Sequence, residues 1–200
     1  MIHLIHGIRT PDGDKVVPRL LPYLKELEAV DYPDYGYIMA VETRRINPVI
    51  VGSILPYIMP GDVLVGHSNG CAIIMHLLDA GISPAGIVFI NGALKNNFVL
   101  PPRVPFAHVY FNAGDDITEV AEVAEAFAGT PVDEYWGDLG HAGYKGTDPR
   151  VKNWNCGDPM QYAFGYDLPP VDGHSDIFTI GKIEMWGPFI ANNLREALHG

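Results

Sequence analysis

Short apolar runs alternate with longer stretches of helical periodicity along this chain. Several runs are apolar at every position and rich in β-branched residues, as is typical of parallel strands buried on both faces. The runs occupy residues 2–5, 35–41, 62–65, 86–90, 107–111 and, more weakly, 132–135. Candidate helices lie between and after them, at 14–27, 48–59, 69–80, 118–128 and 182–198. The alternation predicts an α/β fold, with about six mainly parallel strands between two layers of helices, as a single domain over residues 1–200.

The amino-acid composition argues against some classes of binding partner and cellular location. Acidic residues outnumber basic ones by 24 to 13, giving a net charge of −11, which repels phosphate backbones and argues against nucleic-acid binding. No apolar run approaches the roughly 20 residues that a transmembrane helix needs. The amino terminus lacks the features of a secretory signal, and Cys71 and Cys156 have no metal-type spacing. We therefore expect a reduced, cytoplasmic protein with no transmembrane segment.

The segment 137–173 interrupts the alternation. It is rich in proline and glycine and carries three aromatic residues, Trp154, Tyr162 and Phe164. Long stretches without periodicity are often functional in compact domains. Two interpretations stay open: a flap or pocket rim that contacts an apolar group of the substrate, and a packed surface excursion.

The sequence Gly-His-Ser-Asn-Gly at residues 66–70 stands between the apolar run 62–65 and the helical stretch after it. This G-x-S-x-G pattern in a strand–turn–helix context predicts a sharp turn that projects the Ser68 hydroxyl away from the sheet. Gly66 and Gly70 are expected where larger side chains would collide as strand and helix cross. The helix that begins after Ser68 would direct its free N–H groups toward a developing negative charge.

The chain here resembles the α/β-hydrolase family, over most of its length. The resemblance implies a sheet order of 2-1-3-4-5-6 and a site where the order reverses, at the carboxyl ends of the first and third strands. His6 and Gly7 follow the first strand and Ser68 ends the third. In the family, backbone N–H groups after these two strands bind the oxyanion, which by match would be those of Ile8 and Asn69.

The resemblance also implies an acid and a base, in the chain order serine, acid, histidine. The acid follows the fifth strand, where Asp115 and Asp116 are adjacent. Asp116-Ile117-Thr118 is similar to the Asp-x-Val-Thr pattern of such hydrolases, so Asp116 is preferred and Asp115 is the alternate. Either carboxylate could instead cap the following helix.

Two histidines are candidates for the base. Gly173-His174-Ser175-Asp176 resembles the sequence around the family's histidine, and a helix follows it. His141 lies closer to the expected last strand. We prefer His174, with His141 as the alternate.

The function implied is that of a serine hydrolase that cleaves a carboxylic ester of a small molecule through an acyl-serine, with no metal or organic cofactor. A thioesterase, an amidase or a lipase would use the same triad. A catalytically idle binding protein with this fold is the alternative outside enzymes. A phosphate-binding module is poorly supported, because residues 66–70 lack the lysine of a P-loop.

Overall fold

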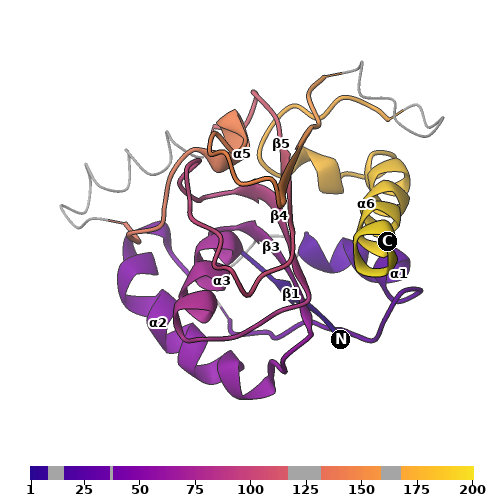
Figure 1. Ribbon diagram of the computed structural model, residues 1–200. Coiled ribbons are helices and arrows are strands. Elements are labelled where there is room, and N and C mark those ends of the chain that lie inside the picture. The colour runs from indigo at the N-terminus through magenta and orange to yellow at the C-terminus, as the bar shows by residue number, and fades with distance from the viewer. Residues whose placement is uncertain (9–15, 37, 117–131, 159–167) are drawn as a thin grey trace.

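A six-stranded parallel sheet organises the part of the chain that the computed structural model describes, residues 1–8, 16–36, 38–116, 132–158 and 168–200 (Figure 1). The strands are β1 (Ile2–Ile5), β2 (Val30–Asp31), β3 (Val63–Ser68), β4 (Gly86–Gly92), β5 (Ala107–Phe111) and β6 (Val151–Asn155). Their order is β2-β1-β3-β4-β5-β6, and every neighbouring pair is parallel. The predicted order is confirmed, and the direction of winding reverses between β1 and β3.

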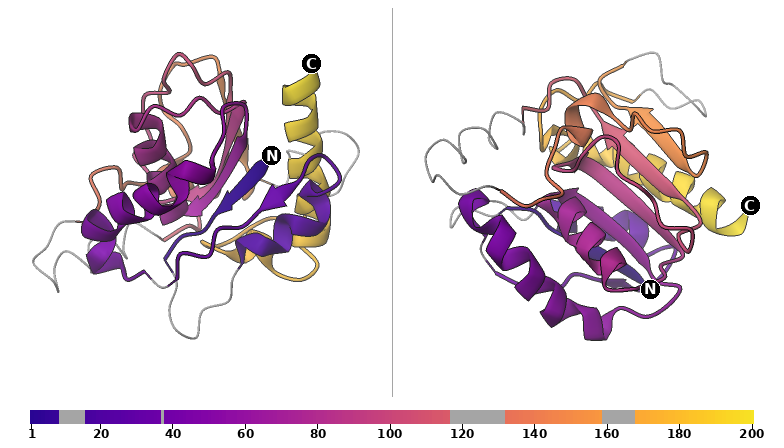
Figure 2. Two further views of the ribbon diagram at one scale, coloured as in Figure 1. Left: turned by 90° about the horizontal axis from the view of Figure 1, so that it is seen from below. Right: turned by 60° about the vertical axis from the view of Figure 1, so that its left-hand side comes forward.

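Helices cover both faces of the sheet. The α-helices are α1 (Leu21–Leu24), α2 (Thr43–Ile54), α3 (Asn69–Asp79), α5 (Leu139–Ala142) and α6 (Ile183–His199). Short 3-10 helices occupy Val17–Leu20, Ala40–Glu42, Leu55–Tyr57 and Asp176–Phe178. Figures 1 and 2 show α2 and α3 on one side of the sheet and α1 and α6 on the other. The predicted three-layer sandwich is therefore confirmed.

Two hydrophobic cores result from the alternation of side chains along each strand. Leu64 and Phe89 pack against α2 and α3 on one face. Val65 and Val88 pack against α1 and α6 on the other. Burial on both faces therefore explains why β3 and β4 are apolar at every position up to their polar ends.

Two strands lie elsewhere than predicted. The second strand is Val30–Asp31 and not 35–41, whose described residues form no strand beyond an isolated bridge at Ile38 before a 3-10 helix begins at Ala40. The sixth strand is Val151–Asn155, inside the segment 137–173, whereas 132–135 is irregular. Both are edge strands of the sheet, and neither presents a continuous apolar run.

The predicted helices at 69–80 and 182–198 are confirmed as α3 and α6. The helix predicted at 48–59 is α2, which begins earlier, at Thr43, and ends at Ile54. The helix predicted at 14–27 is broken into one 3-10 turn and one α-helical turn, each with a proline near its start. The helix predicted at 118–128 lies outside the described residues.

Trp154 belongs to the core. It lies on β6, is 7% exposed and packs edge-on against Phe189 of α6, with ring centroids 5.2 Å apart. Of the two interpretations left open for the segment 137–173, packing applies to Trp154, whereas Tyr162 and Phe164 lie outside the described residues. Among the described helices, none has both the length and the apolar character needed to cross a bilayer.

Candidate active site

Ser68 ends β3 in a backbone conformation that side chains rarely adopt. Its φ is 57° and its ψ is −130°, and α3 begins at the next residue, Asn69. Such angles cost a non-glycine residue on the order of 1–3 kcal/mol and persist only where the surrounding structure enforces them. The sharp turn predicted between strand and helix is present, with Ser68 at its apex.

Glycines allow the backbone to pack tightly around this turn. A Cβ atom at Gly70 would lie 2.1 Å from the carbonyl oxygen of Ile5, and one at Gly66 would lie 2.7 Å from Cδ1 of Ile74. A Cβ atom at Gly7 would lie 2.9 Å from Oγ of Ser68. The loop after β1 thus touches the serine itself, as expected where the sheet order reverses.

The ring of Tyr35 packs against His6, the first residue after β1. The imidazole of His6 stacks on Tyr35 at 3.8 Å between centroids, and its Nδ1 donates to the carbonyl of Gly7 at 2.8 Å. The hydroxyl of Tyr35 donates to the carbonyl of His6. These contacts fix the backbone that leads into Ile8, whose side chain packs near the start of α3.

His174 and Asp115 meet across two loops. Nδ1 of His174 lies 2.9 Å and 3.0 Å from the two carboxylate oxygens of Asp115. The Asp115 side chain is fully buried, while that of His174 is 19% exposed. A Cβ atom at Gly140 would lie 2.1 Å from Oδ2 of Asp115, so the carboxylate occupies space that a side chain there would need.

The other two candidates lie differently. Asp116, the residue preferred from the sequence, is exposed, and the alternate Asp115 is the carboxylate that contacts His174. His141 is exposed on α5, and its Nδ1 lies 3.2 Å from the backbone carbonyl of Asp115. The structure therefore brings together Asp115 and His174, and places Asp116 and His141 outside that pair.

His67 connects this pair with the turn at Ser68. Its Nε2 donates to the carbonyl of His174 at 3.1 Å, and the two rings lie 4.9 Å apart. Burial, together with the nearby imidazole of His174, lowers the pKa of His67 to about 3, so this ring is a neutral donor. Nε2 of His174 is itself buried and has no hydrogen-bond partner among the described residues.

A buried polar network lies behind the first residue of α3. The Asn69 side chain exchanges hydrogen bonds of 2.9 Å and 3.0 Å with Asn47 of α2 and accepts one of 2.7 Å from Nε1 of Trp136. Asn47 also donates to Asp133 at 2.8 Å, and Asp133 contacts Nε2 of His76 at 2.8 Å. Sequence patterns did not indicate this network, because its members come from three separated segments, namely α2, α3 and residues 133–136.

The two partners at the end of this network alter each other's titration. Burial opposes ionisation of Asp133, but its hydrogen bonds with His76 and the Tyr135 amide outweigh it and lower the pKa of this carboxyl. Burial likewise opposes protonation of His76, yet Asp133 raises the pKa of the imidazole above its ordinary value. Each group therefore favours the charged form of the other in a largely buried position.

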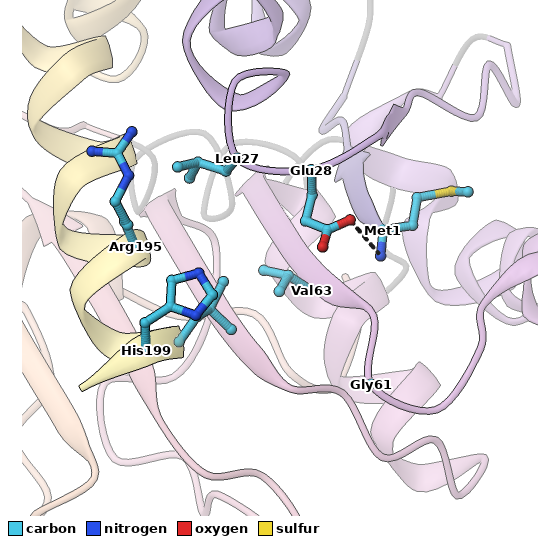
Figure 3. A pocket seen from close by; sticks show the side chains of 8 residues that line it. Met1, Leu27, Glu28, Gly61, Val63, Arg195 and His199 are labelled. Atoms are coloured by element: carbon cyan, nitrogen blue, oxygen red, sulfur yellow. Dashed lines mark ion pairs between the residues drawn. The ribbon is translucent and has the colours of Figure 1, made fainter.

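Among the cavities that the described residues line, two lie at opposite ends of the sheet. One cavity, of about 500 Å³, adjoins the loop after β5 that carries Asp115. It is lined by Ala113, Gly114, Asn155, Gly157, Pro170, Val171, Asp172 and Lys182. The other, of about 140 Å³, is shown in Figure 3 between the amino-terminal ends of β1 and β3 and the end of α6. The second cavity is remote from Ser68, which lies at the carboxyl end of β3. No cluster of three or more metal-ligating side chains occurs among the residues that the structure describes.

Similar solved structures share this arrangement of strands and helices. No family model matches the sequence, and no curated protein sequence matches it. An extracellular α/β-hydrolase from a Paenibacillus species is 16% identical, with 100% of this chain and 99% of that chain covered at a TM-score of 0.50. The chain has the α/β-hydrolase fold.

Two further structures support this assignment of the fold. A YdeN-like hydrolase from Pectobacterium atrosepticum is 15% identical over 98% of this chain and 91% of that one, with a TM-score of 0.50. The protein TT1662 from Thermus thermophilus is 14% identical over 100% and 89%, again with a TM-score of 0.50. At such low identity the likeness establishes the α/β-hydrolase fold, while the chemistry has to be argued from the residues.

Proposed function

We propose that this protein is a serine hydrolase that cleaves a carboxylic ester of a small molecule through an acyl-serine intermediate. Ser68 is the nucleophile, His174 the general base and Asp115 the acid that orients it. The observation that carries the proposal is the hydrogen-bonded pair of His174 and Asp115, because the loop of His174 accepts a hydrogen bond from His67, the residue before the strained Ser68.

The hydrogen bonds of His174 support its role as base. Because a carboxylate only accepts hydrogen bonds, Nδ1 beside Asp115 carries the proton and Nε2 carries the lone pair. Nε2 is buried and makes no other hydrogen bond within the described residues, so it is available to take the proton of Ser68. The carboxylate then stabilises the imidazolium that forms as Ser68 attacks the carbonyl carbon.

Backbone N–H groups would hold the oxyanion. Asn69 is the first residue of α3, where N–H groups lack partners within the helix and the helix dipole favours negative charge. The N–H of Ile8, after the loop that touches Ser68, would be the second donor, by match with the α/β-hydrolase family. When the intermediate collapses, the bond to the alcohol oxygen breaks, His174 gives its proton to the departing alcohol and an acyl-serine remains. Water activated by His174 then attacks the acyl-serine, which releases the carboxylic acid and restores the Ser68 hydroxyl.

Trapping the acyl-enzyme tests the proposal. The protein is mixed with p-nitrophenyl acetate or butyrate, quenched in acid and digested, and the peptides are analysed by mass spectrometry. We expect the acyl group on Ser68 of the wild type and of a Ser53→Ala control, in which a helix hydroxyl bonded to the Ile50 carbonyl is removed. Ser68→Ala should neither form the adduct nor turn over ester. A folded wild type without turnover, or undiminished turnover by Ser68→Ala, would refute the proposal.

A further inference from the structure

Two asparagines at neighbouring strand ends are completely buried beneath the loop that carries His174. Asn91 lies near the end of β4 and Asn112 directly follows β5, and both side chains have no exposed surface. A buried amide without hydrogen bonds is costly, so its partners show what it is placed to hold. The proposed chemistry does not otherwise use either residue.

Asn91 holds two consecutive carbonyl groups of this loop. Its Nδ2 donates to the carbonyl of His174 at 2.6 Å and to that of Gly173 at 3.3 Å. Its φ is 41°, a left-handed conformation that asparagine tolerates better than most residues do. With the bond from His67, the His174 carbonyl accepts two hydrogen bonds from side chains of the central sheet.

Asn112 connects the loop that carries His174 with the loop that carries Asp115. Its Oδ1 accepts from the amides of Gly114 and Gly173, each at 3.1 Å. Its Nδ2 donates to the carbonyl of Gly173 at 3.3 Å and to Oδ1 of Asn91 at 3.2 Å. The backbone carbonyl of Asn112 accepts from the amide of Asp115 at 3.1 Å. One residue therefore fixes the loops of both partners.

We propose that Asn91 and Asn112 are positioning residues that set the distance between Asp115 and Nδ1 of His174. This inference rests on the proposed function, because it assigns the pair a role in the reaction. Gly173 has a φ of 117° and no atom near the place of a Cβ, so packing of a side chain does not restrain the loop at this residue and hydrogen bonds to its backbone do. Displacement of a catalytic group by about 1 Å can lower a rate by on the order of 100-fold.

Asn91→Gly is the decisive variant. Glycine accepts the left-handed backbone and introduces no charge, so the variant removes the amide without adding strain. The matched control is Asn193→Ala, which removes another buried asparagine, one that lies on α6 and donates to Oη of Tyr110 on β5. Asn91→Ser, with a side chain shorter than the amide, is made in parallel in case Asn91→Gly does not fold.

Two readouts separate positioning from general stability. The first is the downfield proton resonance of the His174 Nδ1–H, assigned by its loss in His174→Gln. The second is the division of ester kinetics into kcat and KM. We expect Asn91→Gly to lose or shift the resonance and to lower kcat by about 10- to 100-fold with little change in KM. Asn193→Ala should retain both the resonance and kcat.

Two results would overturn the inference. One is an unchanged resonance or an unchanged kcat in Asn91→Gly. The other is a loss of the resonance and of kcat in Asn193→Ala as large as that in Asn91→Gly. If the wild type hydrolyses no ester, the proposed function fails, whereas the resonance still decides whether these amides hold the pair of His174 and Asp115. The two claims can therefore fail separately.

Discussion

The carboxylate of Asp115 and Nδ1 of His174 are hydrogen-bonded at 2.9 Å, although 59 residues separate them in the chain. The neighbouring carboxylate, Asp116, is exposed and makes no such contact with His174. A single-residue difference in the acid loop thus decides which side chain can orient the imidazole. This relationship leads directly to a paired test.

Asp115→Asn should lower kcat for ester hydrolysis by a factor on the order of 10³ to 10⁴, because an amide that donates to Nδ1 leaves the proton on the wrong nitrogen. Asp116→Asn should leave kcat/KM close to that of the wild type, since its side chain is in solvent. Steady-state kinetics with a p-nitrophenyl ester decide between the two. A loss in Asp116→Asn alone would restore the choice made from the sequence.

The two histidines can be compared in the same way. His174→Ala should abolish measurable ester turnover, because the base is removed. His141→Ala should keep most of it, since within the described residues the imidazole of His141 makes one hydrogen bond, to the backbone carbonyl of Asp115. Circular dichroism would establish that both variants are folded. The reverse order of activities would show that the base had been assigned to the wrong loop.

Two glycines should respond in opposite ways to alanine. Gly70→Ala should lower the free energy of unfolding by about 1–3 kcal/mol or more, because its Cβ would meet the Ile5 carbonyl oxygen at 2.1 Å. Gly52→Ala, on an open face of α2, should raise it by roughly 0.5–1 kcal/mol. Urea unfolding measures both. Equal stability of the two variants would contradict the close crossing of β1 and α3.

The central part of the fold could be read from the sequence. β3 and β4 are apolar on both faces up to their polar ends, and the Gly-His-Ser-Asn-Gly turn joins the end of β3 to α3, so these strands and the elbow could be predicted from the residues. The sheet order was predicted from the resemblance to the α/β-hydrolase family. The edges could not. β2 has only two residues, and in β6 Lys152 and Asn153 are polar and exposed, so no apolar run marks either strand.

The candidate site, like the fold, could be predicted from the sequence only in part. Ser68 is identified by its local turn, whereas the acid depends on contacts between distant segments. Asp115 is favoured over Asp116 by the space at Gly140 and by the anchoring of its loop through Asn112, neither of which a local motif records. The sequence did not indicate the roles of Asn91 and Asn112 or the network of Asn47 and Asp133. Single asparagine and aspartate residues belong to no local motif that would mark them.

The ion pair between His76 and Asp133 should make stability depend on pH. Because Asp133 raises the pKa of His76 in the folded state, this contribution is fully present below the unfolded pKa of about 6.5 and is lost as pH rises through the folded pKa. Asp133 stays ionised in this range, since its own pKa is lowered. The unfolding free energies of wild type and His76→Gln, measured between about pH 5 and pH 9, should converge as pH rises. A constant difference would contradict this assignment.

The activation of Ser68 is the central claim, and a fluorophosphonate probe tests it most directly, because such probes react with serines that a neighbouring base activates. The protein is incubated with the probe, and the labelled peptide is located by mass spectrometry. We predict one labelled residue, Ser68, with labelling greatly slowed in Asp115→Asn and His174→Ala and absent in Ser68→Ala. A folded wild type that stays unlabelled, or that is labelled at another serine, would contradict the account.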